Sequence, residues 1–266
     1  MPPNILVFSY LNSPWCRFQH KNFGAKADGK SDDTQVSGTE TFNDQGSLAW
    51  SQNNCAKTGT CNSLPINLAF TSITNSKIQD INIKIGDDSV SLGDGSQQIN
   101  IENVTCGPRH GISVGSLGKY HDEQPVMGVT VRNYTLTSTT FGVRVKTWPN
   151  SPSGVASYLD FEDIVMNNVS TCLLIDQEYC PYAQCNAEVP SRVKISNVSF
   201  KNIRGTSATK QAVKIICSRS IPCQNVQISD ISLQYNGKDG PITSVCKNVK
   251  PSAFGKLNPP ACANYN

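Results

Sequence analysis

Two adjacent carboxylates and a histidine lie within one stretch from Lys84 to Gly118, which reads KIGDDSVSLGDGSQQINIENVTCGPRHGISVGSLG. One of Asp87 and Asp88 can act as an acid and the other as a base at the same bond, because their proximity pushes their pKa values apart. His110 can orient or tune them, and the glycines nearby allow a substrate to approach the backbone closely. A plain turn is the alternative interpretation of an Asp-Asp pair beside glycine, so the residues downstream decide between the two.

Two cations follow in the segment GVRVKTW, where Arg144 and Lys146 are two positions apart. On a strand, residues i and i+2 point to the same face, so the two positive charges would lie side by side. Such a pair suits a ligand that carries a carboxylate, although a solvated basic edge is the alternative. Tyr179, in the segment DQEYC, is by itself better explained as a core residue.

An internal repeat predicts the elements that position these side chains. A six-residue unit alternates apolar and polar residues and has Asn or Asp at its fifth position; the units begin at Ile99, Val129, Leu159, Val193 and Val226. Units of this kind cannot bury their apolar face alone and must stack on one another. The spacing of 30 to 34 residues therefore predicts a parallel β-helix, in which the fifth residue hydrogen-bonds its equivalents above and below. A β-sandwich would instead show turn signals every ~8–12 residues.

Composition limits the classes of function. Charged residues make up 16% of the 266 residues, and the net charge of +3 is spread without a basic block, which argues against a nucleic-acid-binding protein. No apolar run approaches the ~18 residues of a membrane span. We expect a single β-helix domain over residues 21–266, after an N-terminal segment (1–20) without an interpretable pattern. We expect the chain to be monomeric, with no metal, no other cofactor, and neither nucleic acid nor membrane among its partners.

The eleven cysteines suggest an oxidising compartment. None has the spacing of a zinc site, and most fall into close pairs: Cys55 with Cys61, Cys180 with Cys185, Cys217 with Cys223, and Cys246 with Cys262. Disulfides and secretion are the expectation, with at least one thiol left over. The apolar run at 5–11 lacks the basic segment and cleavage site of a usual signal peptide.

Four sequons provide candidate glycosylation sites, at Asn103, Asn133, Asn168 and Asn197. Three of these asparagines fall on the fifth position of the repeat, where stacking could bury the amide. Asn168 is out of phase with the repeat, and we expect a glycan there first.

The segments GDDSVSLGDGS, CGPRHGISVGSLGKY, GVRVKTW and DQEYC resemble, in this order, the motifs of the polygalacturonases of glycoside hydrolase family 28. The flanking segments GAKADGKSDDT, WSQNNCAKTGTCNSLPINL and YNGKDGPITSVCKNVKP resemble those of the pollen exopolygalacturonases of plants. The resemblance covers roughly residues 21–262. It implies a right-handed parallel β-helix, in agreement with the repeat, and a protein secreted to the cell wall that acts on pectin.

The resemblance also implies roles for the site residues. Asp87 would be the general acid that protonates the glycosidic oxygen, and Asp88 would help to activate water in an inverting mechanism. His110 would match the histidine of the family's Gly-His-Gly motif. The substrate-binding residues would be Arg144, Lys146 and Tyr179.

The sequence departs from the family pattern in three places. The Asn-Thr-Asp motif that precedes Gly-Asp-Asp, and that supplies a further aspartate, is absent, because NSKIQDI runs directly into NIKIGDD. Ser89 replaces a cysteine, which leaves Cys106 as a free thiol, and Arg109 replaces the glycine before His110. The tail resembles the family closely enough to imply a Cys246–Cys262 disulfide. We expect a hydrolase of galacturonosidic bonds with impaired activity; the alternative is a non-catalytic, secreted relative that binds pectin or is structural.

Overall fold

The computed structural model describes residues 35–37, 41–43, 68–84, 88–181 and 185–262. Asp87, Cys55, Cys61 and the segment 1–20 lie outside these residues. Within the described part, no helix is long and apolar enough to cross a membrane.

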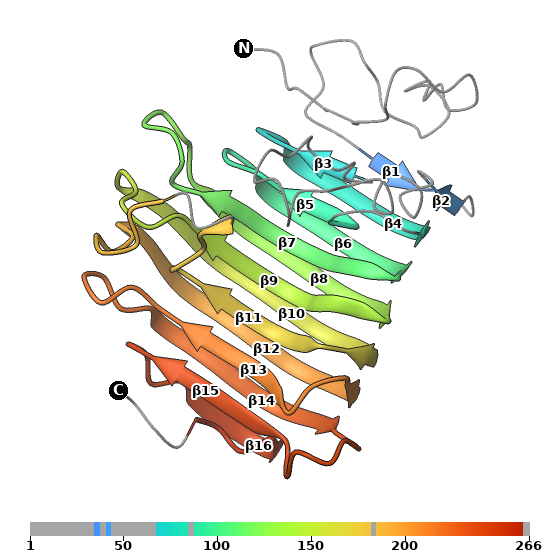
Figure 1. Cartoon of the computed structure of the whole chain (residues 1–266). Coiled ribbons are helices and arrows are strands. Elements are labelled where there is room, and N and C mark those ends of the chain that lie inside the picture. The colour runs from blue at the N-terminus through green and yellow to red at the C-terminus, as the bar shows by residue number, and fades with distance from the viewer. Residues whose placement is uncertain (1–34, 38–40, 44–67, 85–87, 182–184, 263–266) are drawn as a thin grey trace, which may run out of the picture.

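Strands in two parallel sheets make up most of this structure (Figure 1). In the described residues, sheet A has nine strands: β1 (Gln35–Ser37), β2 (Thr41–Asn43), β4 (Thr74–Lys84), β6 (Gln97–Cys106), β8 (Val126–Thr137), β10 (Gly154–Val169), β12 (Val193–Ser207), β14 (Gln224–Gln234) and β16 (Ser252–Asn258). Within the same described residues, sheet B has seven strands: β3 (Leu68–Phe70), β5 (Val90–Leu92), β7 (Arg109–Leu117), β9 (Thr139–Thr147), β11 (Thr171–Asp176), β13 (Gln211–Ile216) and β15 (Thr243–Lys247).

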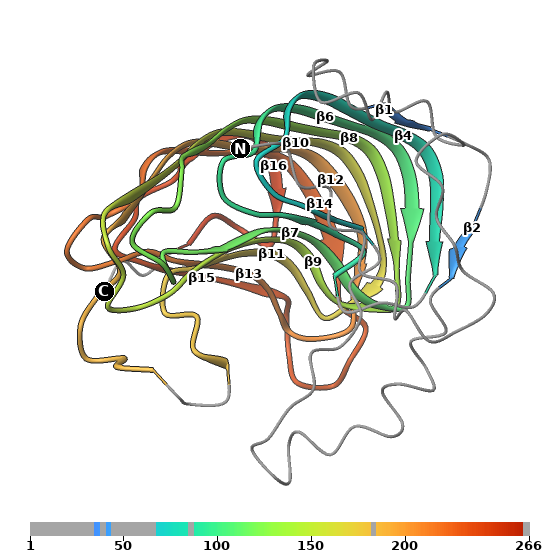
Figure 2. The ribbon, with the colours of Figure 1, turned by 90° about the horizontal axis from the view of Figure 1, so that it is seen from above.

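From β3 to β16 the chain alternates between the sheets, so that each coil contributes one strand to each layer (Figure 2). This confirms the predicted right-handed parallel β-helix. The apolar positions of the repeat stack in its interior: Ile99 pairs with Val129, and Val129 with Leu159, and all three side chains are fully buried. Burial of such a column removes apolar surface from water at roughly 25 cal/mol per Å², which is what holds neighbouring coils together.

The fifth position of the repeat forms the predicted polar ladder. Asn133 Nδ2 donates to Asn103 Oδ1 at 2.7 Å, and Asn103 Nδ2 donates to Asp80 Oδ1 at 2.8 Å. The φ angles of these three residues are 48°, 56° and 56°, in the left-handed region that Asn and Asp tolerate better than other non-glycine residues. The ladder therefore explains why the repeat requires Asn or Asp there.

One repeat unit was assigned wrongly from the sequence. Leu159 pairs with Val198 and Ile164 with Ile203, so the unit of this coil begins at Val198 and not at Val193. Asn197 accordingly does not lie on the first ladder; it accepts a bond of 2.6 Å from Asn225 Nδ2 in a second one. The error arises because the alternating pattern occurs twice in succession, as VKISNV and VSFKNI.

The predicted cysteine chemistry is confirmed where the structure describes it. The described residues contain three disulfides: Cys180–Cys185, Cys217–Cys223 and Cys246–Cys262. Cys106 is a buried free thiol, as predicted, and so is Cys172. Each disulfide closes a loop of the chain, with sequence separations of 5, 6 and 16, which reduces the conformational entropy of the unfolded chain.

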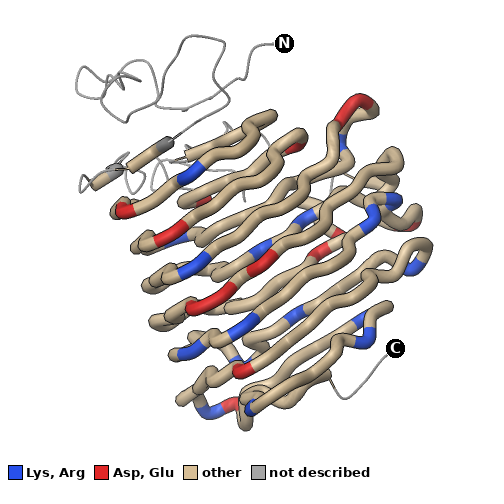
Figure 3. The backbone as a smooth tube through the Cα atoms, turned by 180° about the vertical axis from the view of Figure 1, so that it is seen from behind, with Lys and Arg blue, Asp and Glu red and all other residues tan. Residues whose placement is uncertain are grey.

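Charged side chains on sheet A pair across neighbouring coils. Glu162 accepts from Lys201 Nζ at 2.7 Å and lies 3.1 Å from Arg132 Nε. The hydrogen bond from Lys201 is the main cause that lowers the pKa of Glu162. Figure 3 shows both signs of charge interspersed along the strands, and exposed pairs of this kind contribute little to stability.

Candidate functional site

Successive coils of sheet B bring five of the six predicted site residues together. Asp88 precedes β5, His110 lies in β7, Arg144 and Lys146 lie in β9, and Tyr179 follows β11. Because β5, β7, β9 and β11 are neighbours in the sheet, residues more than fifty positions apart become adjacent. Asp87 lies outside the described residues.

Alternation along β9 sets the direction of the two cations. Val143 and Val145 belong to the core, so Arg144 and Lys146 point to the opposite face of the sheet. Both are nevertheless enclosed by their neighbours, with exposed fractions of 5% and 6%. Charged groups buried to this degree need partners.

The partner of both cations is Asp88. Its Oδ1 lies 2.7 Å from Arg144 Nη2, and its Oδ2 lies 2.8 Å from Lys146 Nζ. Ser113 Oγ donates to the same Oδ1 at 2.8 Å and accepts from Arg144 Nε at 3.0 Å. A buried carboxylate with donors on both oxygens is held in one orientation.

The electrostatics keep Asp88 ionised. Burial by itself raises the pKa of this carboxyl, but the charges of Lys146 and Arg144 and the hydrogen bond from Lys146 outweigh it, with a smaller contribution from His110. Together they lower the pKa from 3.8 to about 2. Asp88 therefore cannot serve as a proton donor near neutral or mildly acidic pH.

His110 belongs to the same group through Phe141. The rings of His110 and Phe141 lie 5.2 Å apart, and the guanidinium carbon of Arg144 lies 4.3 Å from the Phe141 ring centroid. A cation in that position is attracted to the ring face. The preceding Arg109 has a φ of 117°, a conformation that favours the glycine which the family resemblance leads one to expect there.

Ser89, which follows Asp88, forms buried hydrogen bonds next to the cluster of Asp88, Arg144 and Lys146. Ser89 Oγ donates to the Gly111 carbonyl oxygen at 2.8 Å and lies 3.0 Å from Tyr134 Oη. Burial raises the pKa of the neighbouring Cys106 thiol to about 11. A buried Ser–Tyr–Cys cluster thus occupies the place where the family resemblance implies a disulfide.

Tyr179 is a contact of Lys146, and not a core residue. Its side chain is partly exposed, and Lys146 Nζ lies 5.3 Å from its ring centroid. The edge of Tyr179 meets Trp148 with the ring centroids 5.5 Å apart. Tyr179 follows β11, the strand that pairs with β9 on the side opposite β7.

The sequence analysis missed three residues of this group: Ser113, Phe141 and Asp176. Asp176 is the register partner of Lys146 on the next coil, is partly exposed, and has a pKa raised mainly by burial. The signal that could have found Ser113 is the alternation ISV, which places its side chain on the face of Arg144 and Lys146. The segment LLID does not alternate, and only the strand register shows that Asp176 is opposite Lys146. Phe141 gives no such signal, because its role depends on the ring of His110.

The model of the family "Glycosyl hydrolases family 28" matches residues 25–85 and 78–255. A relative from Arabidopsis thaliana, "Exopolygalacturonase clone GBGA483", is 49% identical over 83% of this chain. "Exopolygalacturonase" from Oenothera organensis is 46% identical over 86% of this chain and is covered over 77% of its own length. The chain spans 61% of the Arabidopsis relative.

A solved structure shares the fold. The crystal structure of endo-xylogalacturonan hydrolase from Aspergillus tubingensis aligns with a TM-score of 0.58 and 21% sequence identity, over 74% of this chain and 57% of that one. At this identity the similarity concerns the fold and the β-helical arrangement of coils.

Proposed function

The chain belongs to family 28 of the glycosyl hydrolases, and from this premise we propose that it binds polygalacturonate, the acidic polysaccharide of pectin, and cleaves its α-1,4 bonds weakly. The observation that carries the proposal is the buried cluster of Asp88 with Arg144 and Lys146. Its chemistry divides into proton transfer and substrate binding.

An inverting glycosidase needs one protonated carboxyl and one ionised carboxylate, with a water between the carboxylate and the sugar. The lowered pKa of Asp88, about 2, supports the ionised role for this residue. We assign the general acid to its neighbour Asp87, the role that the family resemblance implies, and the orientation of the reacting groups to His110, whose imidazole can orient or tune nearby carboxyls.

Substrate binding follows from the charge that the cluster retains. Asp88, Arg144 and Lys146 together carry two positive charges and one negative, so these three groups, almost closed to water, retain one positive charge. The carboxyl of Asp176, opposite Lys146, is partly exposed to water. A galacturonate carboxylate approaching Arg144 and Lys146 would neutralise that positive charge, and the attraction is strengthened by the low local dielectric. The Tyr179 ring beside Lys146 offers an apolar face for the sugar.

We propose weak hydrolysis because part of the family's water-activating apparatus is missing. The Asn-Thr-Asp motif does not precede Asp87, and the two family matches overlap at residues 78–85, which contain the point where the sequence implies a deletion. Loss of one general base partner lowers rates by roughly 10²–10⁴-fold. Binding without hydrolysis is the second candidate, and the engagement of both Asp88 oxygens by cations favours it.

We further propose that the protein is a secreted, monomeric protein of the cell wall. The support is the set of three disulfides, which are typical of oxidising compartments, together with the proposed substrate.

The test combines calorimetric binding of trigalacturonate with an assay for new reducing ends. The wild-type chain should bind, and release reducing ends slowly or not at all. Lys146→Met should weaken binding while Asp88 keeps its bonds to Arg144 and Ser113. Lys194→Met, on an exposed part of sheet A, is the matched control and should bind as the wild type does. Absence of wild-type binding refutes the proposal, and hydrolysis at a rate normal for the named relatives refutes its claim of weak activity.

A further inference from the structure

A row of alternating cationic and aromatic side chains leads away from Lys146. Beyond Lys146 comes Tyr179, whose ring meets Trp148 at 5.5 Å between centroids. The ammonium of Lys119 lies 5.4 Å from the Trp148 centroid and 5.4 Å from the Tyr120 centroid. Lys119, Tyr120 and Trp148, called here the outer platform, have no part in the proton transfer described above.

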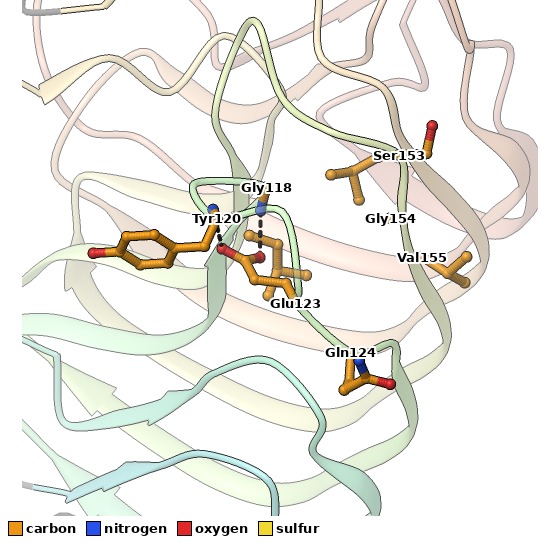
Figure 4. A pocket seen from close by; sticks show the side chains of 9 residues that line it. Gly118, Tyr120, Glu123, Gln124, Ser153, Gly154 and Val155 are labelled. Atoms are coloured by element: carbon orange, nitrogen blue, oxygen red, sulfur yellow. Dashed lines mark hydrogen bonds between the residues drawn. The ribbon is translucent and has the colours of Figure 1, made fainter.

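The loop that carries two of these residues joins β7 to β8 and is held rigidly by Glu123 (Figure 4). The Glu123 carboxylate accepts backbone N–H bonds from Gly118 at 2.5 Å and from Lys119 and Tyr120 at 2.9 Å each. A small pocket lies between this loop and Ser153–Val155 (Figure 4). Because the loop is already ordered, a ligand that binds it loses little further conformational entropy.

The platform is open to a ligand. Tyr120 is 64% exposed, an unusual position for a ring on an ordered loop. Among the described residues, Lys119 forms no salt bridge. The carboxylate of the nearby Glu123 is instead hydrogen-bonded by three backbone N–H groups. Asp122 and His121 are the other titratable groups of the loop, and both are exposed.

The chemistry of the platform repeats that of the inner site. Lys146 beside Tyr179 offers a cation and an aromatic face, and Lys119 between Trp148 and Tyr120 offers the same combination. A cation pairs with a carboxylate, and an aromatic ring packs against an apolar surface. A uronic acid carries both complementary groups in one unit.

We propose that the outer platform is a further subsite, which takes an additional galacturonate unit of a chain held at Lys146. This inference rests on the proposed function, because it assumes that an oligogalacturonate occupies the inner site. The continuous contacts through Tyr179 and Trp148 give the direction in which that chain runs.

The test compares the affinities of digalacturonate and tetragalacturonate, measured by calorimetry on the full chain. In the wild type, the tetramer should bind more tightly than the dimer. Lys119→Met should weaken tetramer binding by roughly 2–5-fold, and Tyr120→Ala by roughly 3–10-fold. Dimer binding should not change in either variant. Lys194→Met is the control for Lys119→Met, and Tyr158→Asn is the control for Tyr120→Ala. Both control residues are exposed on sheet A, and Tyr158 is 57% exposed.

Two further measurements separate charge from packing. Lys119→Met should bind fully methyl-esterified tetragalacturonate as the wild type does, because no carboxylate is then present. Trp148→Phe should keep the affinity for the tetramer, since the indole Nε1–H has no hydrogen-bond partner among the described residues, whereas Trp148→Ala should lower it. Circular dichroism should show native β-structure in each variant.

The outcomes distinguish the two proposals. If the wild type binds neither oligomer, the proposed function fails, and this inference fails with it. If the wild type prefers the tetramer but Lys119→Met and Tyr120→Ala bind it equally well, only the outer subsite is refuted. Equal losses for dimer and tetramer would also refute it, because the platform would then act on the inner site.

Discussion

The substitution Asp88→Asn removes the negative charge from the buried cluster of Asp88, Arg144 and Lys146 while nearly preserving its shape. The asparagine keeps one acceptor oxygen but places an amide NH₂ where the second carboxylate oxygen was. Arg144 and Lys146, which now lie 2.7 and 2.8 Å from Asp88 oxygens, would be left with two buried positive charges. We therefore expect Asp88→Asn to be strongly destabilising.

The magnitude follows from the burial of all three groups. Breaking a buried ion pair by removing one partner costs about 3–5 kcal/mol, and here two cations lose the same partner. The triple variant Asp88→Asn, Arg144→Met, Lys146→Met removes every charge and should recover at least half of the loss, because neutral replacements of similar volume are tolerated in such sites.

The cluster also predicts a pH dependence. A carboxyl whose pKa falls from 3.8 in the unfolded chain to about 2 in the folded one stabilises the fold at neutral pH, by roughly 2 kcal/mol. That contribution is complete above about pH 5 and is lost as the pH falls through 3.8 towards 2. Asp88→Asn lacks it at every pH, so the difference between wild type and variant should shrink under acid.

Urea unfolding followed by circular dichroism, at pH 7 and pH 3, measures both effects. Glu162→Gln is the control, because its carboxylate is paired at the surface and its loss should change the free energy of unfolding by less than about 1 kcal/mol. Equal stability of wild type and Asp88→Asn at pH 7 would refute the reasoning, as would a difference that does not fall at pH 3.

Three other predictions concern backbone packing, thiol reactivity and glycosylation. Gly111→Ala should lower the melting temperature, because a Cβ there would lie 2.2 Å from the Gly142 carbonyl oxygen. Gly154→Ala is the control and should leave the melting temperature unchanged, because the nearest contact of its Cβ would be a side-chain methyl at 3.3 Å. Equal melting temperatures of the two variants would contradict this prediction. Cys106, buried and with a pKa raised to about 11, should react with a thiol reagent only after denaturation, so rapid labelling of the native chain would count against the burial. Glycopeptide mapping should find a glycan on Asn168 in preference to Asn133. Both residues are exposed, so stacking does not bury Asn133 as expected from the sequence, but its amide nitrogen is a ladder donor. The opposite occupancy would show that the ladder does not limit modification.

The repeat shows how far local pattern can determine a fold. Alternation and a left-handed Asn or Asp every coil are properties of six consecutive residues, so they predict strands, corners and stacking without knowledge of the neighbouring coil. They could not decide between Val193 and Val198 as the start of a unit, because both windows satisfy the same pattern. The choice depends on which residues of β12 face β10, where Leu159 pairs with Val198.

Asp80, the first residue of the ladder, is a second case in which the local pattern was not sufficient. Asp80 accepts from Asn103 and has the same left-handed backbone, yet the analysis found no unit in that coil. Ser76 stands where the repeat otherwise has an apolar residue, opposite Ile99, so the local pattern was too weak to identify it. Only the pairing of β4 with β6 shows the coil to be equivalent.

The sequence by itself determined the class of fold, the family, the disulfides at Cys217–Cys223 and Cys246–Cys262, and four of the side chains that gather near Asp88: His110, Arg144, Lys146 and Tyr179. Each of these depends on short patterns or motifs that can be recognised in the sequence without the tertiary structure. The tertiary structure alone decided how Arg144 and Lys146 are used, since both are engaged by Asp88. Removing the two cations together would therefore leave a buried carboxylate without its ion-pair partners. That partnership joins residues 56 and 58 positions apart, and its strength comes from burial between coils, which no local stretch of sequence specifies.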